Sequence, residues 1–174
     1  MKEIKETIGF IGAGNMATAL ISGLINSNHS ASKIIASSPE DEHLERLSSD
    51  FGVHTTSNNQ EVLKIADLVI LAVKPNIIET LMNEIKNEVV DQDIPIISIA
   101  AGVKIKKLES YFGESSRIIR AMPNTPASIM EGVTAISPNK NALSEDIENA
   151  KPVSYTHLRA HETEADLVCR LLLE

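Results

Sequence analysis

Three observations predict an α/β fold with a doubly wound parallel sheet that carries helices on both faces. Short apolar runs alternate along the chain with stretches of helical period. The strongest run, residues 68–73, is apolar throughout, as in a strand that is covered on both faces of a parallel sheet. Aromatic residues make up only 3% of the 174 residues, so the core must be built from Ile, Leu, Val and Ala, which suits such strands.

Each element follows from its own local pattern. Apolar runs predict strands at residues 8–11, 33–36, 68–73, 95–99, 117–121 and 132–136, and a short one that opens at Gly52 and Val53. Helical spacing of apolar residues predicts helices at residues 17–25, 41–49, 61–65, 77–89 and 103–111. Ser144 is expected to cap a further helix, because Glu145 and Asp146 fill its first turn. Ligands of such sheets bind where strands end, so the loops that follow strands are the candidate sites.

The first of these loops carries a dinucleotide fingerprint. Residues 12–17 fit the pattern G-x-G-x-x-A directly after a strand and at the start of a helix. Gly12 allows the tight turn, Gly14 lets the backbone approach a pyrophosphate, and Ala17 lets the helix pack close to the strand. The helix start then offers N–H groups to phosphates. We therefore expect a Rossmann-type domain, and the alternative is a glycine turn without a ligand.

The end of the second strand leaves the choice of cofactor open. An acidic residue that binds a ribose hydroxyl is expected there, but the strand ends at Ser37 and Ser38. Glu40 and Asp41 come slightly late, and no arginine lies beside them to clamp a 2′-phosphate. Either NADPH or NADH therefore fits the sequence.

Five segments carry a resemblance to a known family. Residues 8–17 resemble the opening of pyrroline-5-carboxylate reductases, and residues 36–39 resemble the end of their second strand. Residues 71–75, 98–103 and 120–127 are similar to three later loops of that family, in the same order. The first segment alone is also similar to hydroxyacid dehydrogenases and to deazaflavin-dependent NADP oxidoreductases. The last three together are much more specific.

The resemblance implies an activity and a set of binding residues. Family members reduce the cyclic imine 1-pyrroline-5-carboxylate to proline with NADPH or NADH, and the intact enzyme is expected to be a homo-oligomer. The implied substrate-side residues are Met122, Asn124 and Thr125. The cofactor-binding residues expected from the fingerprint and the resemblance are Gly12, Ala13, Gly14, Asn15, Met16, Ser37, Ser38, Asn59, Ala72, Val73, Lys74, Pro75, Ala100, Ala101 and Gly102.

Several of these residues also have plain structural interpretations. Lys74 is as readily a solvated lysine near a helix start, and the small residues 100–102 also suit a simple turn. Either Asn58 or Asn59 is expected to be a helix N-cap. No catalytic residue is identified, because a protonated imine already accepts hydride well and needs mainly to be positioned.

Composition limits the partners and the location. The net charge of −8 argues against a nucleic-acid partner. No apolar run reaches the roughly 18 residues of a membrane span, and no signal peptide is evident. Cys169 is the only cysteine, which is consistent with a reducing compartment, so a cytoplasmic protein is expected. His29, His43 and His54 are scattered and are expected at the surface.

The chain divides into three predicted parts. Residues 1–138 form the dinucleotide-binding domain, residues 139–151 begin a helical dimerisation domain, and residues 152–174 do not resemble the family. That tail resembles translated vector or adaptor sequence, and the alternative is a divergent native tail. His157 and His161 stand four apart in it without a third ligand in view, so no metal site is expected. A module that binds NAD(P)H without catalysis, or a relative of the hydroxyacid dehydrogenases, are the alternative functions.

Overall fold

The computed structural model describes residues 6–123 and 134–154. Its strands are β1 (Ile8–Ile11), β2 (Ile34–Ser37), β3 (His54–Thr56), β4 (Leu68–Leu71), β5 (Ile96–Ser98), β6 (Ile118–Pro123) and β7 (Thr134–Pro138). Its helices are α1 (Asn15–Asn26), α2 (Asp41–Phe51), α3 (Asn59–Ile65), α4 (Ile78–Asp91), α5 (Ile105–Phe112) and α6 (Ser144–Ser154), with a 3₁₀ turn η1 (Ala31–Lys33). Each predicted strand and helix corresponds to one of these elements.

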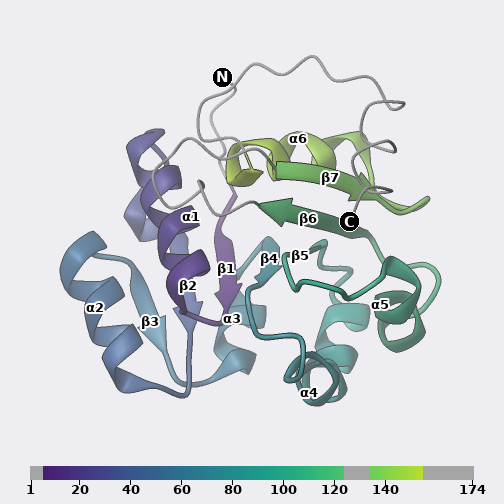
Figure 1. The fold of residues 1–174 in the computed structure, drawn as a ribbon, viewed down its shortest axis with the longest axis horizontal. Helices are drawn as coiled ribbons and strands as arrows, with labels where there is room; N and C mark the ends of the chain where they lie inside the picture. The colour runs from purple at the N-terminus through teal and green to yellow at the C-terminus, as the bar shows by residue number, and fades with distance from the viewer. Residues whose placement is uncertain (1–5, 124–133, 155–174) are drawn as a thin grey trace.

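The described strands form one sheet in the order β3-β2-β1-β4-β5-β6-β7 (Figure 1). The first six strands are parallel, and the order reverses between β1 and β4, which is the switch point at which doubly wound folds bind ligands. The predicted parallel, doubly wound Rossmann-type sheet is therefore confirmed. The last strand differs: β7 pairs with β6 in the antiparallel direction.

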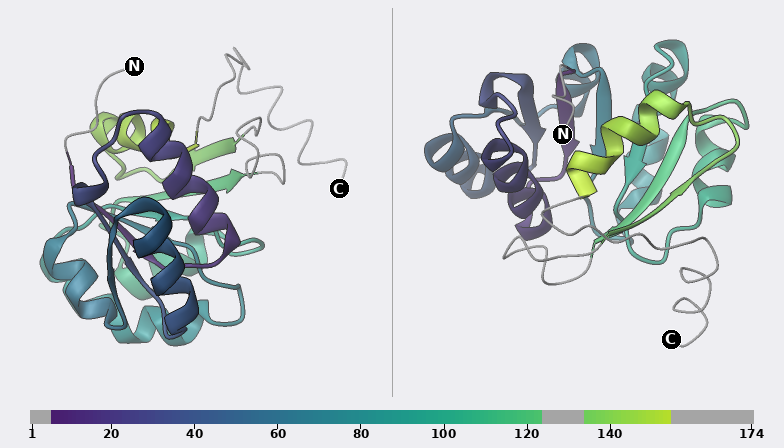
Figure 2. Two further views of the ribbon diagram at one scale, coloured as in Figure 1. Left: turned by 90° about the vertical axis from the view of Figure 1, so that its left-hand side faces the viewer. Right: turned by 90° about the horizontal axis from the view of Figure 1, so that it is seen from above.

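Two apolar layers fill the space on the two sides of the sheet. One layer joins α1, α2 and α6 to side chains such as Phe10, Ile70 and Ile119. The other joins α3, α4 and α5 to Ile11, Val69 and Ile118. Neighbouring residues of one strand therefore enter opposite cores, which explains why the central strands β1 and β4 carry no polar side chain. Figure 2 shows the helices on both sides of the sheet, with α6 alongside β6 and β7.

Most element boundaries differ from the predictions by one to three residues, for local reasons. Helix α1 begins at Asn15, directly after Gly14, rather than at residue 17. Gly52 does not open a strand but ends α2 in a left-handed conformation with φ of 67°, which glycine adopts without strain. Pro75 lies in a turn, and α4 begins three residues later at Ile78.

The prediction of three surface histidines is wrong for one of them. His54 is exposed and His43 is partly exposed, and each lies near a glutamate. His29, however, is only 7% exposed, and neither ring nitrogen has a hydrogen-bond partner among the described residues. It follows Asn28, whose φ of 66° turns the chain sharply after α1 and carries the next side chain inward. Over the described ranges, no helix is long and apolar enough to cross a membrane.

Candidate functional site

The carboxyl ends of the parallel strands bring the predicted loops to one edge of the sheet. Ile11 at the end of β1 is in register with Ser37 of β2 and Leu71 of β4, and Leu71 is in register with Ser98 of β5. Loops that are far apart in sequence therefore leave neighbouring strands at the same level. This edge includes the switch point between β1 and β4.

The fold itself requires a glycine at position 12, whether or not a ligand is bound. Its φ is 103°, and a Cβ at this position would lie 2.6 Å from the carbonyl oxygen of Ala72. Its N–H donates to the carbonyl oxygen of Ser37 at 2.9 Å. The turn after β1 is thus packed against the ends of both neighbouring strands, and it directs the chain into α1.

Gly14 is not required by the described chain, and its surroundings fit a phosphate. It has an ordinary extended conformation with φ of −74°, and a Cβ would meet no described atom within 4 Å. In the described part of the chain, no side chain caps α1 and no acidic residue occupies its first turn. An open helix start with free N–H groups and no competing carboxylate suits a dinucleotide pyrophosphate.

The end of β2 is held by a short chain of side-chain hydrogen bonds. Ser37 is buried, and its hydroxyl donates to Oδ1 of Asn59 at 2.7 Å. Nδ2 of Asn59 in turn donates to Oε1 of Glu84 on α4 at 3.0 Å. Asn58, rather than Asn59, is the N-cap of α3, since its side chain accepts from the N–H of Gln60. Asn59 is therefore free of the capping role and braces the loop beneath the predicted ribose site.

The two serines at this strand end are not equivalent. The single hydroxyl proton of Ser37 goes to Asn59, so Ser37 has only lone pairs left to offer a ligand. The hydroxyl oxygen of Ser38 accepts from the N–H of Glu40 at 3.1 Å, which leaves its proton available. Ser38 is thus the better donor to a ribose or phosphate oxygen. The carboxylate of Glu40 is directed to His43, with Oε2 3.1 Å from Nδ1.

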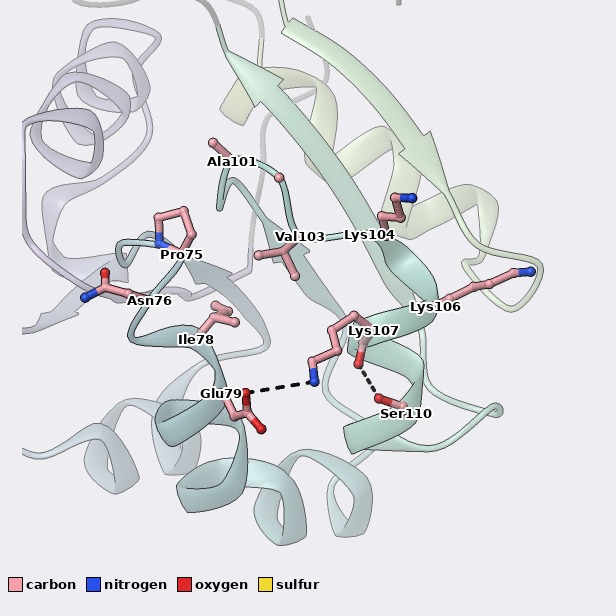
Figure 3. Close-up of a pocket in the computed structure, with 11 residues that line it drawn as sticks. Pro75, Asn76, Ile78, Glu79, Ala101, Val103, Lys104, Lys106, Lys107 and Ser110 are labelled. Atoms are coloured by element: carbon pink, nitrogen blue, oxygen red, sulfur yellow. Dashed lines mark hydrogen bonds and ion pairs between the residues drawn. The ribbon is translucent and has the colours of Figure 1, made fainter.

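A cleft of about 740 Å³ lies between the starts of α4 and α5, beside two of the predicted loops (Figure 3). Its size is within the range of small-molecule sites. Lys74 is exposed and lies outside the lining. Ala100 is buried, so it contributes only backbone to this edge. The lining consists of Pro75, Asn76, Ile78, Glu79, Ala101, Gly102, Val103, Lys104, Lys106, Lys107 and Ser110.

Three lysines make this cleft locally positive in an acidic chain. Lys107 is held over the ring of Tyr111, 4.9 Å from its centroid, and its Nζ lies 3.9 Å from Oε2 of Glu79. Hydrogen bonding with the Tyr111 side chain, and then attraction to Glu79, raise the pKa of Lys107 above the usual lysine value. Lys107 thus stays protonated under neutral conditions. Sequence analysis missed the lysines, although Lys104 and Lys106 follow a strand-end loop directly.

The predicted substrate-side residues are only partly described. Met122 lies on β6, is partly buried, and contacts the guanidinium of Arg120. Asn124 and Thr125 lie outside the described residues. Arg120 belongs to the same motif, but sequence analysis gave it no role. Among residues 6–123 and 134–154, no three His, Cys, Asp or Glu side chains are grouped to hold a metal ion, and His157 and His161 fall outside these ranges.

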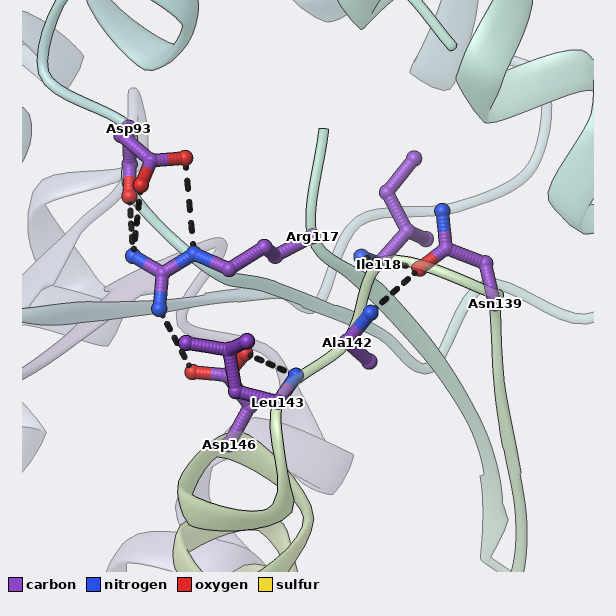
Figure 4. A network of polar contacts seen from close by, with 7 residues as sticks. All are labelled: Asp93, Arg117, Ile118, Asn139, Ala142, Leu143 and Asp146. Atoms are coloured by element: carbon purple, nitrogen blue, oxygen red, sulfur yellow. Dashed lines mark hydrogen bonds and ion pairs between the residues drawn. The ribbon is translucent and has the colours of Figure 1, made fainter. Parts of the chain in front are cut away.

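A second polar cluster lies at the opposite, amino-terminal end of β6 (Figure 4). Nη1 of Arg117 lies 2.9 Å from Oδ1 of Asp146, which is buried at the start of α6. Nη2 of Arg117 lies 3.3 Å from Oδ2 of Asp93 and also donates to the carbonyl oxygen of Asp93. Oδ1 of Asn139 accepts from the N–H groups of Ile118 and Ala142. These groups satisfy one another, so the cluster is structural.

Comparison with known proteins agrees with this geometry. The chain is 39% identical to a pyrroline-5-carboxylate reductase of Escherichia coli over 144 residues, which cover 82% of the chain and 53% of the relative. A pyrroline-5-carboxylate reductase structure from Coxiella burnetii superposes with a TM-score of 0.85 at 35% identity, covering 88% of the chain and 57% of that structure. The Plasmodium falciparum pyrroline carboxylate reductase with NADP bound gives 0.77 at 29% identity, covering 89% and 56%.

These matches bear out the resemblance predicted from the five segments. The chain spans about half the length of the curated relatives that it matches. The model of the family described as "NADP oxidoreductase coenzyme F420-dependent" matches residues 7–102, which is more than half of the chain and includes the glycine loop and the loops after β2, β4 and β5. The chain therefore belongs to that family of NADP oxidoreductases, and within the curated proteins it is similar to the pyrroline-5-carboxylate reductases.

Proposed function

We propose that the chain is the dinucleotide-binding part of a pyrroline-5-carboxylate reductase, which reduces 1-pyrroline-5-carboxylate to L-proline with NADPH or NADH in the last step of proline biosynthesis. The observation that carries the proposal is the unfilled space at Gly14, at the uncapped start of α1. The 39% identity to the Escherichia coli reductase supports the choice of reaction. The same proposal includes a cytoplasmic location and a homo-oligomeric whole enzyme, with residues 139–151 beginning the dimerisation domain.

The proposed binding residues follow the sheet edge from the adenosine end to the nicotinamide end. Residues 12–16 at the start of α1 hold the pyrophosphate, and the hydroxyl of Ser38 and the braced Asn59 lie at the ribose of the adenosine. Ser37 lies at the same strand end and keeps the loop in place. The loops of residues 72–75 and 100–102 flank the nicotinamide. Met122, with Asn124 and Thr125, lies on the substrate side.

The reaction requires the chain to position the imine against the nicotinamide and to exclude water, and it does not require a strong acid or base. A bound reduced nicotinamide supplies the hydride, and a protonated imine accepts it readily. The small residues 100–102 allow a flat ring to approach the backbone, because Gly102 adopts φ of 73° and Ala101 carries only a methyl group. Correct placement alone lowers such barriers by about 7–11 kcal/mol in favourable cases.

Two measurements on the purified chain test the proposal separately. The chain has no tryptophan, so the fluorescence of added NADPH or NADH reports binding without a protein background. Oxidation of the reduced nucleotide is then followed by its absorbance in the presence of 1-pyrroline-5-carboxylate. We expect saturable binding, and turnover that depends on the imine. A chain that binds neither nucleotide would refute the proposal.

The same measurements separate the alternatives. Binding without turnover identifies a module that holds NAD(P)H and needs further residues for catalysis. Reduction of NADP⁺ or NAD⁺ by a small hydroxy acid, with no response to the imine, identifies a hydroxyacid dehydrogenase relative. Comparing NADPH with NADH in the binding experiment gives the cofactor preference that Ser37 and Ser38 leave open.

A further inference from the structure

Three hydrogen-bonded side chains connect the end of β2 to helix α4 through the start of α3. The Ser37 hydroxyl donates to Oδ1 of Asn59 at 2.7 Å, and Nδ2 of Asn59 donates to Oε1 of Glu84 at 3.0 Å. Ser37 is buried, Asn59 is partly exposed and Glu84 is exposed. The direction of donation therefore runs from the sheet towards the surface.

The two ends of this hydrogen-bond chain differ in the directions that they allow. Oγ of Ser37 also lies 3.4 Å from the carbonyl oxygen of Phe10, so its proton has a second acceptor. Because a hydroxyl can donate or accept, Ser37 is equally able to accept from Asn59 and donate to Phe10. An ionised carboxylate only accepts, so the N–H side of Asn59 must face Glu84. Of the three side chains, Glu84 therefore fixes the direction of donation.

The direction of donation decides which atom of Asn59 is presented to a ligand. The amide has two N–H groups and a carbonyl oxygen that can accept twice. Glu84 uses one N–H and Ser37 uses one lone pair, so one N–H remains on the nitrogen side and one lone pair on the oxygen side. Turning the amide by half a turn would exchange the two. Glu84 thus holds the remaining donor of Asn59 in one place.

This amide lies at the strand end proposed for the adenosine ribose, next to the glycine loop. The carbonyl oxygen of Ser37 accepts from the N–H of Gly12 at 2.9 Å. NADH and NADPH differ at the 2′ position of that ribose, where NADH has a hydroxyl that donates and accepts, and NADPH has a phosphate whose oxygens accept. An exchanged amide would still satisfy the hydroxyl, but it would place a carbonyl oxygen against the phosphate.

We propose that Glu84 is a positioning residue that acts through Asn59 and enables the site to accept the 2′-phosphate of NADPH. This inference rests on the proposed function, because it takes the loop after β2 as the adenosine site. Electrostatics alone predicts the reverse effect: a carboxylate repels a nearby phosphate, so its removal would strengthen NADPH binding. The positioning role requires that removal of Glu84 weakens NADPH binding and leaves NADH binding almost unchanged.

The test measures the dissociation constants of NADPH and NADH by nucleotide fluorescence for the wild-type chain and two variants of Glu84. Glu84→Met removes the acceptor, and we expect it to weaken NADPH binding about tenfold, as the loss of one hydrogen bond to a charged group predicts. Glu84→Gln keeps an acceptor but can also donate, so its NADPH affinity should fall between the two. NADH affinity should stay within about twofold of wild type in both variants, because a ribose hydroxyl is satisfied by either direction.

Two controls separate positioning from charge and from packing. Asp91→Asn removes a carboxylate from an exposed position at the end of the same helix, and it should leave both affinities unchanged. In an Asn59→Ala background, Glu84→Met should cause no further loss of NADPH affinity, because the residue through which Glu84 acts is already removed. The urea midpoint of Glu84→Met should match the wild type, since the carboxylate is exposed.

The outcomes that overturn the inference are distinct from those that overturn the proposed function. Equal losses of NADPH and NADH affinity in Glu84→Met would mean that Glu84 only holds α3 against α4. Unchanged or tighter NADPH binding, a further loss in the Asn59→Ala background, or a wild-type chain that binds NADH but not NADPH would also remove the role of Glu84. The phosphate site at Gly14 would survive all of these results. A wild-type chain that binds neither nucleotide would instead refute the proposed function, and the inference would fall with it.

Discussion

At the scale of single residues, substitution by valine is predicted to abolish nucleotide binding at Gly14 and to lower the stability of the fold at Gly12. Gly14→Val points its side chain into open space, so stability should fall by no more than about 1 kcal/mol, mostly from poorer capping of α1. NADPH affinity should be lost, because the side chain occupies the phosphate site. Gly12→Val combines φ of 103° with a contact of 2.6 Å to the carbonyl oxygen of Ala72. It should cost at least about 2–3 kcal/mol.

Urea unfolding and nucleotide fluorescence measure the two effects separately. Unchanged NADPH affinity in Gly14→Val, with the variant folded, would contradict the assignment of the phosphate site. Equal destabilisation of the two variants would mean that the space around Gly14 is not open. The fingerprint assigns Gly12 to the turn and Gly14 to the pyrophosphate, and the structure adds the physical basis: a close backbone contact at Gly12 and open space at Gly14.

Residue-scale prediction fails where burial or hydrogen bonding depends on backbone geometry that the sequence pattern does not reveal. His29 was expected at the surface because the three histidines are scattered along the sequence, but the sharp turn at Asn28 carries it into the interior. Asn59 could not be distinguished from Asn58 until the N-cap was seen.

At the scale of elements, the packing of α3 on β1 depends on Gly9, which lies outside the dinucleotide fingerprint of residues 12–17. A Cβ on Gly9 would lie 2.5 Å from Cγ1 of Val62 and 2.7 Å from Cβ of Ala66. Gly9→Ala should therefore destabilise the chain by about 1–3 kcal/mol, the usual cost of overpacking. The Gly9→Ala/Val62→Ala double variant should lose less than the sum of the single variants, because it removes one of the two contacts. Strict additivity in urea unfolding would show that α3 does not pack this closely.

Element identity was predictable because burial on both faces leaves a strong signal. The runs at β1 and β4 carry no polar side chain, β5 has only Ser98 at its end, and the structure buries every residue of these three strands. The direction of each strand was harder to predict from the sequence. Nothing in the residues of β7 distinguishes a parallel from an antiparallel partner, and only the pairing in the structure shows that it runs antiparallel to β6.

At the scale of the whole molecule, the pair of Arg117 and Asp146 attaches α6 to the sheet. Asp146 is buried and also accepts from the N–H of Leu143 at 2.8 Å, so it joins the start of α6 to the amino-terminal end of β6. Further along α6, Ala150 is buried in the core shared with α1, and Ile147 packs against that core. The helix is therefore held by a polar contact at its start and by apolar contacts along its length.

Removing one partner of this pair should be far more damaging than removing both charges. Arg117→Met leaves a buried carboxylate unpaired and should cost about 3 kcal/mol in urea unfolding. Arg117→Met/Asp146→Asn should regain most of that loss, because the amide oxygen still accepts from Leu143 without a charge. Hydrogen exchange should rise in α6 and β7 in the single variant and return towards wild type in the double variant. Arg46→Met, at an exposed position, should change stability by less than about 0.5 kcal/mol. If the double variant is as unstable as Arg117→Met, the guanidinium acts through its contacts with Asp93 instead, and the loop before β5 rather than α6 is the element that it holds.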